Sequence, residues 1–179
     1  MTLALVRHGR TPWNLERRMQ GRSDIPLDEV GRAQADAAGR LLAEAVWHRV
    51  VSSPLQRAVL SAEIIRQHVG DLPFSADPAL LERDYGDADG LPVAEAWERW
   101  PDGEYPGSEP VDDTRDRAAR ALRSLARAEG STIVVAHGAL LRAGIQALTG
   151  SDCPRIGNGE IILLETSGEG RFVARSLSG

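Results

Sequence analysis

The chain has 179 residues, of which 42% are hydrophobic and 26% charged, with a formal net charge of −5. This size and composition predict one globular domain over residues 1–179, and the lone Cys153 excludes a disulfide within the chain. The acidic balance argues against a nucleic-acid partner, because proteins that bind nucleic acid present a basic face. No apolar run has the length of a membrane span and no signal-peptide pattern is present, so we expect a cytoplasmic protein without a membrane partner.

The first predicted element is a short buried strand, Leu3 to Val6, which ends in Arg7-His8-Gly9. In open α/β sheets, ligands bind just beyond the carboxyl ends of strands. A cation, an imidazole and a glycine at such an end are typical of an active site. A surface Arg-His pair after a core strand is the alternative, and a three-residue motif alone does not decide between them.

A polar loop follows, and Asp28 is suited to cap a helix that ends near Ala45. Helical spacing predicts that the buried face of this helix carries Val30, Ala33, Ala37 and Leu41.

A second strand is predicted over residues 47–51, ending in Ser52-Ser53-Pro54. Pro54 suits the first turn of the next helix, which places Arg57 near the strand end. Helix N-termini favour anions, so Arg57 is a candidate anion ligand; a solvated helix charge is the alternative.

The middle of the chain predicts a short edge strand over residues 72–76 and then a segment, around residues 83–113, rich in Pro, Gly, Trp and acidic residues. Within it we expect a short helix over 92–100 and a loop over 101–110. Long loops in compact domains commonly form lids or binding walls, so we call residues 83–113 the lid segment.

The remaining elements begin with a helix capped by Asp112, Asp113 or Thr114, running to about residue 129 and ended by Gly130. Residues 132–136 (Thr-Ile-Val-Val-Ala) predict a central buried strand that ends in His137-Gly138, followed by a helix to residue 148. A closing hairpin is predicted from 160–165 and 171–175, turned at 167–170.

Three strand–helix units thus end in candidate site residues: Arg7 with His8, Arg57, and His137. Alternation of strands and helices predicts an α/β fold with a mostly parallel sheet, so these ends meet at one edge. Two imidazoles and two guanidiniums suit a small, multiply charged anion, and guanidinium matches phosphate through paired hydrogen bonds. No phosphate-binding glycine loop and no convincing metal-ligand spacing are present, so we expect no metal, no cofactor and a histidine nucleophile.

Five separated motifs occur in order along the chain. They are Arg7-His8-Gly9, Gln20-Gly21-Arg22 followed by Pro26-Leu27, the run from Ser52 to Ala58, Glu82, and His137-Gly138. Together they resemble the motifs of the histidine phosphatase superfamily, in its phosphoglycerate mutase-like branch. The resemblance covers nearly the whole chain and implies a three-layer α/β/α sandwich, with the mostly parallel sheet, the C-terminal hairpin and the inserted lid segment.

The resemblance implies that His8 accepts the phosphoryl group and that Arg7, Arg57 and His137 form the phosphate pocket. Glu82 would protonate the leaving oxygen and then act as base for water. Cations around His8 lower its pKa, in the direction that a nucleophile requires.

Further contacts are implied for residues around this core. Asn14 and Gly138 would contact the phosphate, and Gln20 and Gly21 would line the substrate side. Arg10 replaces the acidic residue usual after the Arg-His-Gly run, and we expect it to add positive charge near the mouth of the site.

The branch holds both mutases and phosphatases. Asp84 stands where the mutase pattern has a histidine, and Val93 where it has a lysine. The mutase insertion with paired arginines has no counterpart here, because residues 100–111 contain no basic residue. We therefore expect a phosphatase acting on a small-molecule phosphomonoester. Mutase activity dependent on 2,3-bisphosphoglycerate is the alternative, and a non-catalytic relative that binds phosphorylated ligands or partner proteins is another.

Acidic residues in the lid segment predict a substrate without a second anionic group, such as a sugar, nucleoside or alcohol phosphate. Trp97, Trp100 and Tyr105 are candidate stacking faces. The sequence is compatible with a monomer or a homodimer. The acidic residues are Asp84, Asp87, Asp89, Glu104 and Glu109.

Overall fold

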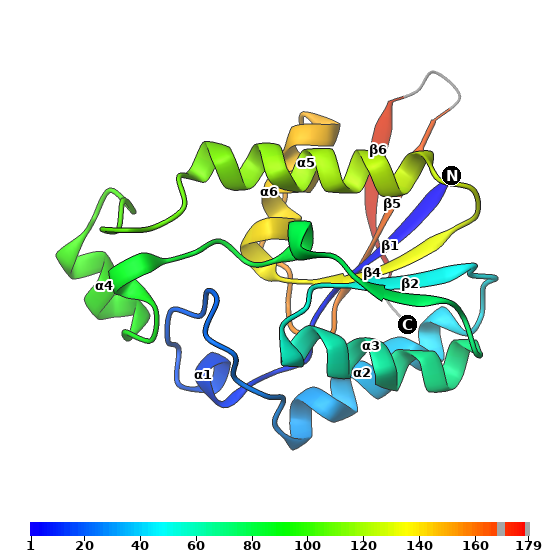
Figure 1. Ribbon diagram of the computed structural model, residues 1–179, viewed down its shortest axis with the longest axis horizontal. Helices are drawn as coiled ribbons and strands as arrows, with labels where there is room; N and C mark the ends of the chain where they lie inside the picture. The colour runs from blue at the N-terminus through cyan, green and yellow to red at the C-terminus, as the bar shows by residue number, and fades with distance from the viewer. Residues whose placement is uncertain (168–170, 178–179) are drawn as a thin grey trace.

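A six-stranded sheet in the order β3-β2-β4-β1-β5-β6 forms the centre of the computed structural model, which describes residues 1–167 and 171–177 (Figure 1). Strands β1 to β4 run parallel, whereas β5 pairs antiparallel with both β1 and β6. The mostly parallel sheet and its C-terminal hairpin are therefore confirmed; the predicted turn at 168–170 lies outside the described residues. The strands are β1 (Thr2–Arg7), β2 (Arg49–Ser52), β3 (Phe74–Ala76), β4 (Thr132–Ala136), β5 (Ile161–Thr166) and β6 (Phe172–Leu177).

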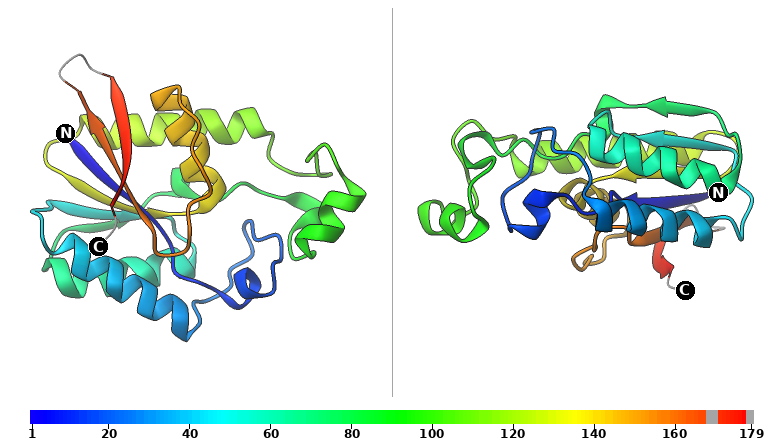
Figure 2. Two further views of the ribbon diagram at one scale, coloured as in Figure 1. Left: turned by 180° about the vertical axis from the view of Figure 1, so that it is seen from behind. Right: turned by 90° about the horizontal axis from the view of Figure 1, so that it is seen from below.

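Helices cover both faces of this sheet, which confirms the three layers (Figures 1 and 2). Strand residues alternate between the faces. Leu3 and Leu5 pack in the cluster that contains α5 (Val111–Arg127) and α6 (Gly138–Thr149). Ala4 and Val6 pack in the cluster that contains α2 (Glu29–Leu42) and α3 (Gln56–Val69). Burial on both faces explains why β1 and β4 read as continuous apolar runs.

Three of the four residues predicted for the buried face of α2 do not lie on it. Val30 is 44% exposed, and Ala33 and Ala37 are also exposed. Leu41 is partly buried and packs on the core as predicted, and two glycines point inward. A Cβ on Gly31 would lie 2.0 Å from the carbonyl oxygen of Arg10, and one on Gly39 would lie 2.5 Å from the ring of His68. Close approach of the backbone, which only glycine allows, decides this face, so a search for large apolar residues misses it. The buried residues are Gly31, Ala35, Ala38, Gly39 and Leu42.

Several element boundaries also move by a few residues. Helix α3 begins at Gln56, beyond Pro54, and β2 begins at Arg49. Helix α5 begins after Pro110, and Thr114 lies inside its first turn, where its hydroxyl donates to the carbonyl of Pro110 at 3.3 Å. The cap predicted at 112–114 is therefore wrong, because Pro110 already presets the entry to the helix. The end at Arg127 falls two residues before the predicted end.

The lid segment lies beyond the carboxyl ends of the parallel strands, beside α1 (Pro12–Leu15), and carries α4 (Val93–Arg99) (Figure 1). It has a small core of its own, formed by Met19, Ala88, Ala96 and Tyr105. Backbone hydrogen bonds from Met19 N to Leu91 O and from Gly90 N to Met19 O, each 2.8 Å, fix it to the loop after α1. Two short 3-10 turns, Pro78–Leu80 and Gly86–Ala88, complete the described elements. None of the helices within residues 1–167 and 171–177 is long and apolar enough to cross a membrane.

Candidate active site

Sheet register brings the predicted strand-end residues together. The amide of His8 donates to the carbonyl of Ala136 at 3.0 Å, and the amide of Ser53 donates to that of Val135 at 2.9 Å. The rings of His8 and His137 consequently lie edge to face, with centroids 5.1 Å apart. Three segments distant in the sequence thus deliver their polar side chains to one edge of the sheet.

His8 is held as a neutral imidazole with a defined tautomer. Its Nδ1 lies 2.7 Å from the carbonyl oxygen of Gly9, which can only accept, so Nδ1 carries the proton and Nε2 keeps a lone pair. Burial, followed by the charges of Arg57 and Arg7, lowers the pKa of His8 well below its ordinary value. Gly9 is required for this geometry, because a Cβ there would lie 2.1 Å from the carbonyl oxygen of Gly31.

His137 is fully buried, and Ser53 orients it. The Ser53 hydroxyl lies 2.7 Å from Nε2 of His137 and accepts from the amide of Leu55 at 3.4 Å. Within the described part of the chain the Ser53 hydroxyl proton has no other acceptor, so it is donated to Nε2, and Nδ1 of His137 carries the N–H. His137 therefore presents a neutral donor; burial and then Arg57 lower its pKa well below the ordinary value.

Arg57 is completely buried and braced by backbone carbonyls. Its Nη1 and Nη2 donate to Ser23 O at 2.7 Å and to Gly21 O at 2.6 Å. Burial lowers its pKa to about 10, which leaves the guanidinium charged at neutral pH. Arg7 is also held by a backbone carbonyl, because its Nη1 donates to the carbonyl of Ile156 at 2.7 Å.

Glu82 lies at the N-terminus of α6 and is 95% buried, with a relative exposure of 5%. Its Oε1 accepts from the amides of Leu140 at 2.9 Å and Arg83 at 3.0 Å, and its Oε2 accepts from the amide of Ala139 at 3.0 Å. The free amides of a helix start thus fix the carboxylate in place. The adjoining Gly138 lets Arg7 approach, since a Cβ there would lie 3.3 Å from Arg7 Nε.

Asn14 is set by its neighbours and has one side-chain N–H to spare. Its Oδ1 accepts from the amide of Thr11 and from Nδ2 of Asn158, both at 3.1 Å. Its Nδ2 donates to Oε1 of Gln20 at 3.0 Å, which uses one of two donor protons. Gly21 plays a different part from the one predicted: its carbonyl braces Arg57 and its amide donates to Asp89 at 2.9 Å.

Buried polar atoms without partners gather in this site. Such atoms are rare in folded proteins and point to an absent ligand or water. Across the described part of the chain seven buried side-chain N or O atoms lack a partner, and four of them belong to predicted site residues. Those four are Arg7 Nε, Gln20 Nε2, Arg57 Nε and His137 Nδ1. The arginine and glutamine nitrogens always carry hydrogen, and the tautomer set by Ser53 puts a hydrogen on Nδ1 of His137 as well. All four atoms are therefore hydrogen-bond donors, which suits an anion.

The site opens into a pocket with a volume of about 550 Å³. Of the predicted residues, Arg7, Asn14, Gln20, Glu82 and Gly138 line it, whereas His8, Arg57 and His137 are buried next to it. Gly21 does not line this pocket.

Arg10 does not face the pocket, contrary to expectation. Its Nε makes an ion pair with Asp28 at 2.7 Å, and its amide donates to Gln34 at 2.8 Å. The charge of Arg10 is therefore paired with Asp28, the residue that caps the start of α2.

The expected acidic rim is also wrong. Glu109 forms a two-pronged pair with Arg117 at 2.7 and 2.8 Å, and Asp84 lies 3.5 Å from Arg22. Asp89 accepts from backbone and hydroxyl groups of the loop before α2. Asp87 and Glu104 are exposed and do not line the pocket. Glu109, Asp84 and Asp89 therefore serve contacts within and beside the lid segment, and none of the five acidic residues lines the pocket, although Asp102 does.

Several residues that shape the site escaped the sequence analysis. Ser61 accepts from the amide of Gly9 at 3.0 Å and donates to the carbonyl of Arg57 at 2.7 Å, so it ties the two strand ends together. Asn158 donates to the carbonyl of His8 at 3.0 Å. Ser53 stood within a quoted motif, but no local pattern marks Ser61 or Asn158. Among the described residues, no group of three or more His, Cys, Asp or Glu side chains is arranged to hold a metal ion.

Burial of two neutral histidines predicts a pH-dependent stability. Above pH 6.5, the ordinary pKa of histidine, His8 and His137 are neutral in both the folded and the unfolded chain. Below pH 6.5 these two histidines take up protons in the unfolded chain but stay neutral in the folded one, where their pKa values are lowered. The free energy of unfolding should therefore fall below pH 6.5, by on the order of 1 kcal/mol per pH unit for each histidine. Urea unfolding of wild type at several pH values measures this slope. His137→Gln should flatten it, exposed His48→Gln should not, and an unchanged slope in His137→Gln would contradict the assignment.

Comparisons with known proteins agree with this geometry. The family model for the histidine phosphatase superfamily (branch 1) matches residues 3–177. A protein of Bacillus subtilis strain 168 named uncharacterized phosphatase PhoE is 40% identical over 152 residues, covering 84% of this chain and 78% of that protein. A 2,3-bisphosphoglycerate-dependent phosphoglycerate mutase of Gloeobacter violaceus is 36% identical over 163 residues, covering 82% and 74%.

A similar solved structure is that of a mycobacterial glucosyl-3-phosphoglycerate phosphatase complexed with VO3. It superimposes with a TM-score of 0.88 at 28% identity and covers 98% of this chain and 97% of that one. The family match over almost the whole chain, together with the histidine–arginine site at the sheet edge, shows that the chain is an enzyme of the phosphatase class and belongs to the histidine phosphatase superfamily, branch 1.

Proposed function

We propose that this enzyme hydrolyses small phosphomonoesters through a phosphohistidine formed on His8. One observation carries the proposal: Nδ1–H of His8 is bound to the Gly9 carbonyl, so Nε2 is a neutral nucleophile beside the buried guanidinium of Arg57 and the half-buried one of Arg7. The lone pair of Nε2 attacks phosphorus while the ester P–O bond breaks. Arg7, Arg57 and Nδ1–H of His137 stabilise the oxygens of the transferring group, and the spare N–H of Asn14 adds a donor.

Glu82 serves the leaving group in this proposal. Its carboxyl group lines the pocket close to Arg7, and its position is fixed by three backbone amides. The protonated carboxyl gives its proton to the departing ester oxygen. The resulting carboxylate then removes a proton from the incoming water, which attacks phosphorus, breaks the N–P bond and returns inorganic phosphate and neutral His8.

Hydrolysis is favoured over phosphoryl shuttling between two positions of one substrate. The lid segment supplies no basic residue between positions 100 and 111, and Val93, which replaces the lysine of the mutase pattern, lines the pocket. Among the relatives, PhoE of Bacillus subtilis carries a phosphatase name at 40% identity. A mutase must retain the phosphoenzyme against water, and that takes more cationic contacts to the reacting groups than this lid provides.

The test is a panel of phosphomonoesters with phosphate release measured alongside interconversion of 2- and 3-phosphoglycerate. We expect the enzyme to release phosphate from several substrates. We expect the rate of phosphoglycerate interconversion to stay below the rate of phosphate release. Interconversion faster than release, in the presence of 2,3-bisphosphoglycerate, would identify a mutase. Absence of turnover with every ester, despite tight binding of inorganic phosphate, would identify a non-catalytic relative.

A further inference from the structure

Arginines dominate the charged lining of the pocket outside the reacting centre. Besides Arg7, five arginines line it, against the carboxylates of Glu82 and Asp102. The latter is exposed and accepts from the amide of Glu104 at 3.1 Å. The five are Arg17, Arg18, Arg83, Arg142 and Arg155.

Three of these five arginines have structural partners. Arg18 donates to Glu16 at 2.6 Å and to the carbonyl of Gly90 at 2.8 Å. Arg83 donates to the carbonyl of Glu109 at 2.8 Å, and its guanidinium contacts the rings of Tyr85 and Tyr105. Arg142 donates to the carbonyl of Cys153 at 3.2 Å.

Arg17 and Arg155 remain, and no described residue accepts a hydrogen bond from the side chain of either. Both are exposed, and they enter the wall from different ends of the chain. We propose that Arg17 and Arg155 form a second anion-binding subsite, which selects phosphomonoesters whose leaving group carries a carboxylate or another anionic group. This inference rests on the proposed phosphatase function and names the substrate class of the same pocket.

The backbone at Arg17 supports this assignment. Arg17 has a φ of 56°, the positive value that non-glycine residues rarely adopt. Its amide donates to the carbonyl of Asn14 at 3.2 Å, and the amide of Arg18 donates to that of Trp13 at 2.9 Å, which is the Schellman pattern that ends α1. The carbonyl of Arg17 accepts from the amide of Val93 at 2.8 Å, so the backbone holds this arginine between α1 and the lid segment.

Arg155 is coupled to the phosphate-binding end of the pocket. It directly precedes Ile156, whose carbonyl holds Arg7 at 2.7 Å. Burial is the main cause that lowers the pKa of Arg7, and the charge of Arg155 lowers it further. An anionic group between Arg155 and Arg17 would neutralise this repulsion and would reach the pocket wall while the phosphate sits beside His8.

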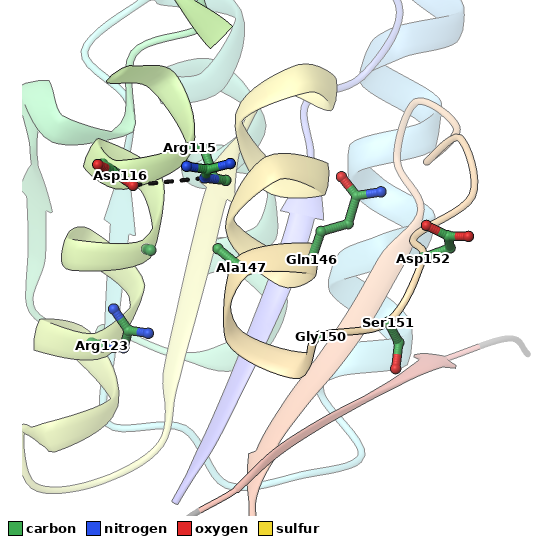
Figure 3. Close-up of a pocket in the computed structure, with 9 residues that line it drawn as sticks. Arg115, Asp116, Arg123, Gln146, Ala147, Gly150, Ser151 and Asp152 are labelled. Atoms are coloured by element: carbon green, nitrogen blue, oxygen red, sulfur yellow. Dashed lines mark ion pairs between the residues drawn. The ribbon is translucent and has the colours of Figure 1, made fainter. Parts of the chain in front are cut away.

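The surface between α5 and α6 offers a contrasting arginine site (Figure 3). There, Arg115 is neutralised by Asp112 at 3.0 Å and Asp116 at 3.7 Å, whereas Arg123 is exposed on the same hollow. Arg123→Gln therefore removes one exposed positive charge at a pocket away from the site, and it serves as the matched control.

The experiment compares substrates that differ only in a carboxylate: 3-phosphoglycerate with glycerol 3-phosphate, and 6-phosphogluconate with sorbitol 6-phosphate. We expect wild type to prefer the carboxylate by at least about tenfold in kcat/KM for at least one pair. Arg17→Asn, which tolerates positive φ, and Arg155→Gln should each reduce that preference, mainly through KM, and together should abolish it. Turnover of the carboxylate-free substrates should change less than about twofold, and Arg123→Gln should leave both substrates unchanged.

Two results overturn the inference while leaving the phosphatase proposal intact: a wild type that hydrolyses both members of each pair equally well, or a preference that survives in the double variant. Equal losses for both members of a pair would also overturn it, because they indicate damage to the lid. A wild type that hydrolyses no phosphomonoester would instead overturn the proposed function itself.

Discussion

Replacement of His8 by alanine is expected to reduce kcat for phosphomonoester hydrolysis by at least about 10⁴-fold. Among the described side chains, only His8 offers an imidazole nitrogen with a free lone pair beside the charges of Arg7 and Arg57, so the variant loses the covalent route altogether. Binding of inorganic phosphate should persist, since the guanidiniums and their backbone partners stay in place. Steady-state kinetics and phosphate titration measure the two effects separately.

The control for His8→Ala is stability, because His8 is buried and its truncation leaves a cavity. His8→Asn, which keeps more of the volume, should be equally inactive and unfold at a higher urea concentration. Exposed His48→Ala should retain full activity. Residual activity within tenfold of wild type in a folded His8 variant would contradict the proposed nucleophile.

Replacement of Arg57 by methionine is expected to weaken both catalysis and the fold. The change removes a charge beside His8 and His137 and leaves the carbonyls of Gly21 and Ser23 without their donor. Each unsatisfied buried carbonyl costs about 1–3 kcal/mol, and loss of one phosphate-stabilising donor lowers kcat by about 10²–10³-fold. Kinetics together with urea unfolding measure these losses.

Arg57→Lys distinguishes the charge from its geometry. A lysine keeps the positive charge but lacks the planar fork that serves two carbonyls and a phosphate at once. Compared with Arg57→Met, we expect Arg57→Lys to regain part of the lost stability but little of the lost kcat. Full recovery of kcat by lysine would show that Arg57 acts only as a distant charge.

The large-scale fold and the reacting centre follow from local sequence signals. Apolar runs such as Leu3 to Val6 encode strands buried on both faces, and alternation with helices makes the strands parallel. Parallel strands then bring Arg7, His8 and His137 to one edge without further information. The resemblance to a known family added Glu82, which lies on no regular element and has no periodicity to reveal it.

Features that depend on close approach or on distant partners were not predictable in this way. Gly31 and Gly39 turn the face of α2 inward because they allow backbone contact, and hydrophobic spacing ignores them. Arg10 was assigned to the mouth of the site by sequence proximity, but Asp28 captures it.

The charge that the lid segment presents to the pocket is not predictable from its sequence, for a related reason. A count of acidic residues does not show their partners, and Arg117 and Arg22, which pair with Glu109 and Asp84, both lie outside the lid segment in the sequence. Arg155 reaches the pocket from a loop near the C-terminal end of the chain. The charged side chains of the pocket wall are therefore mostly basic, where the sequence predicts an acidic rim.

The central claim is covalent transfer to His8, and direct detection of the phosphoenzyme tests it most closely. With p-nitrophenyl phosphate the leaving group needs no proton, so Glu82→Gln should still form the intermediate but hydrolyse it slowly, because the base for water is missing. We predict that intact-mass analysis after a denaturing quench in base shows one phosphoryl group on Glu82→Gln, mapped to His8 and lost in acid, and none on the variant that also carries His8→Ala. A burst of p-nitrophenol without any phosphoryl group on the protein, or with the group on another residue, would contradict it.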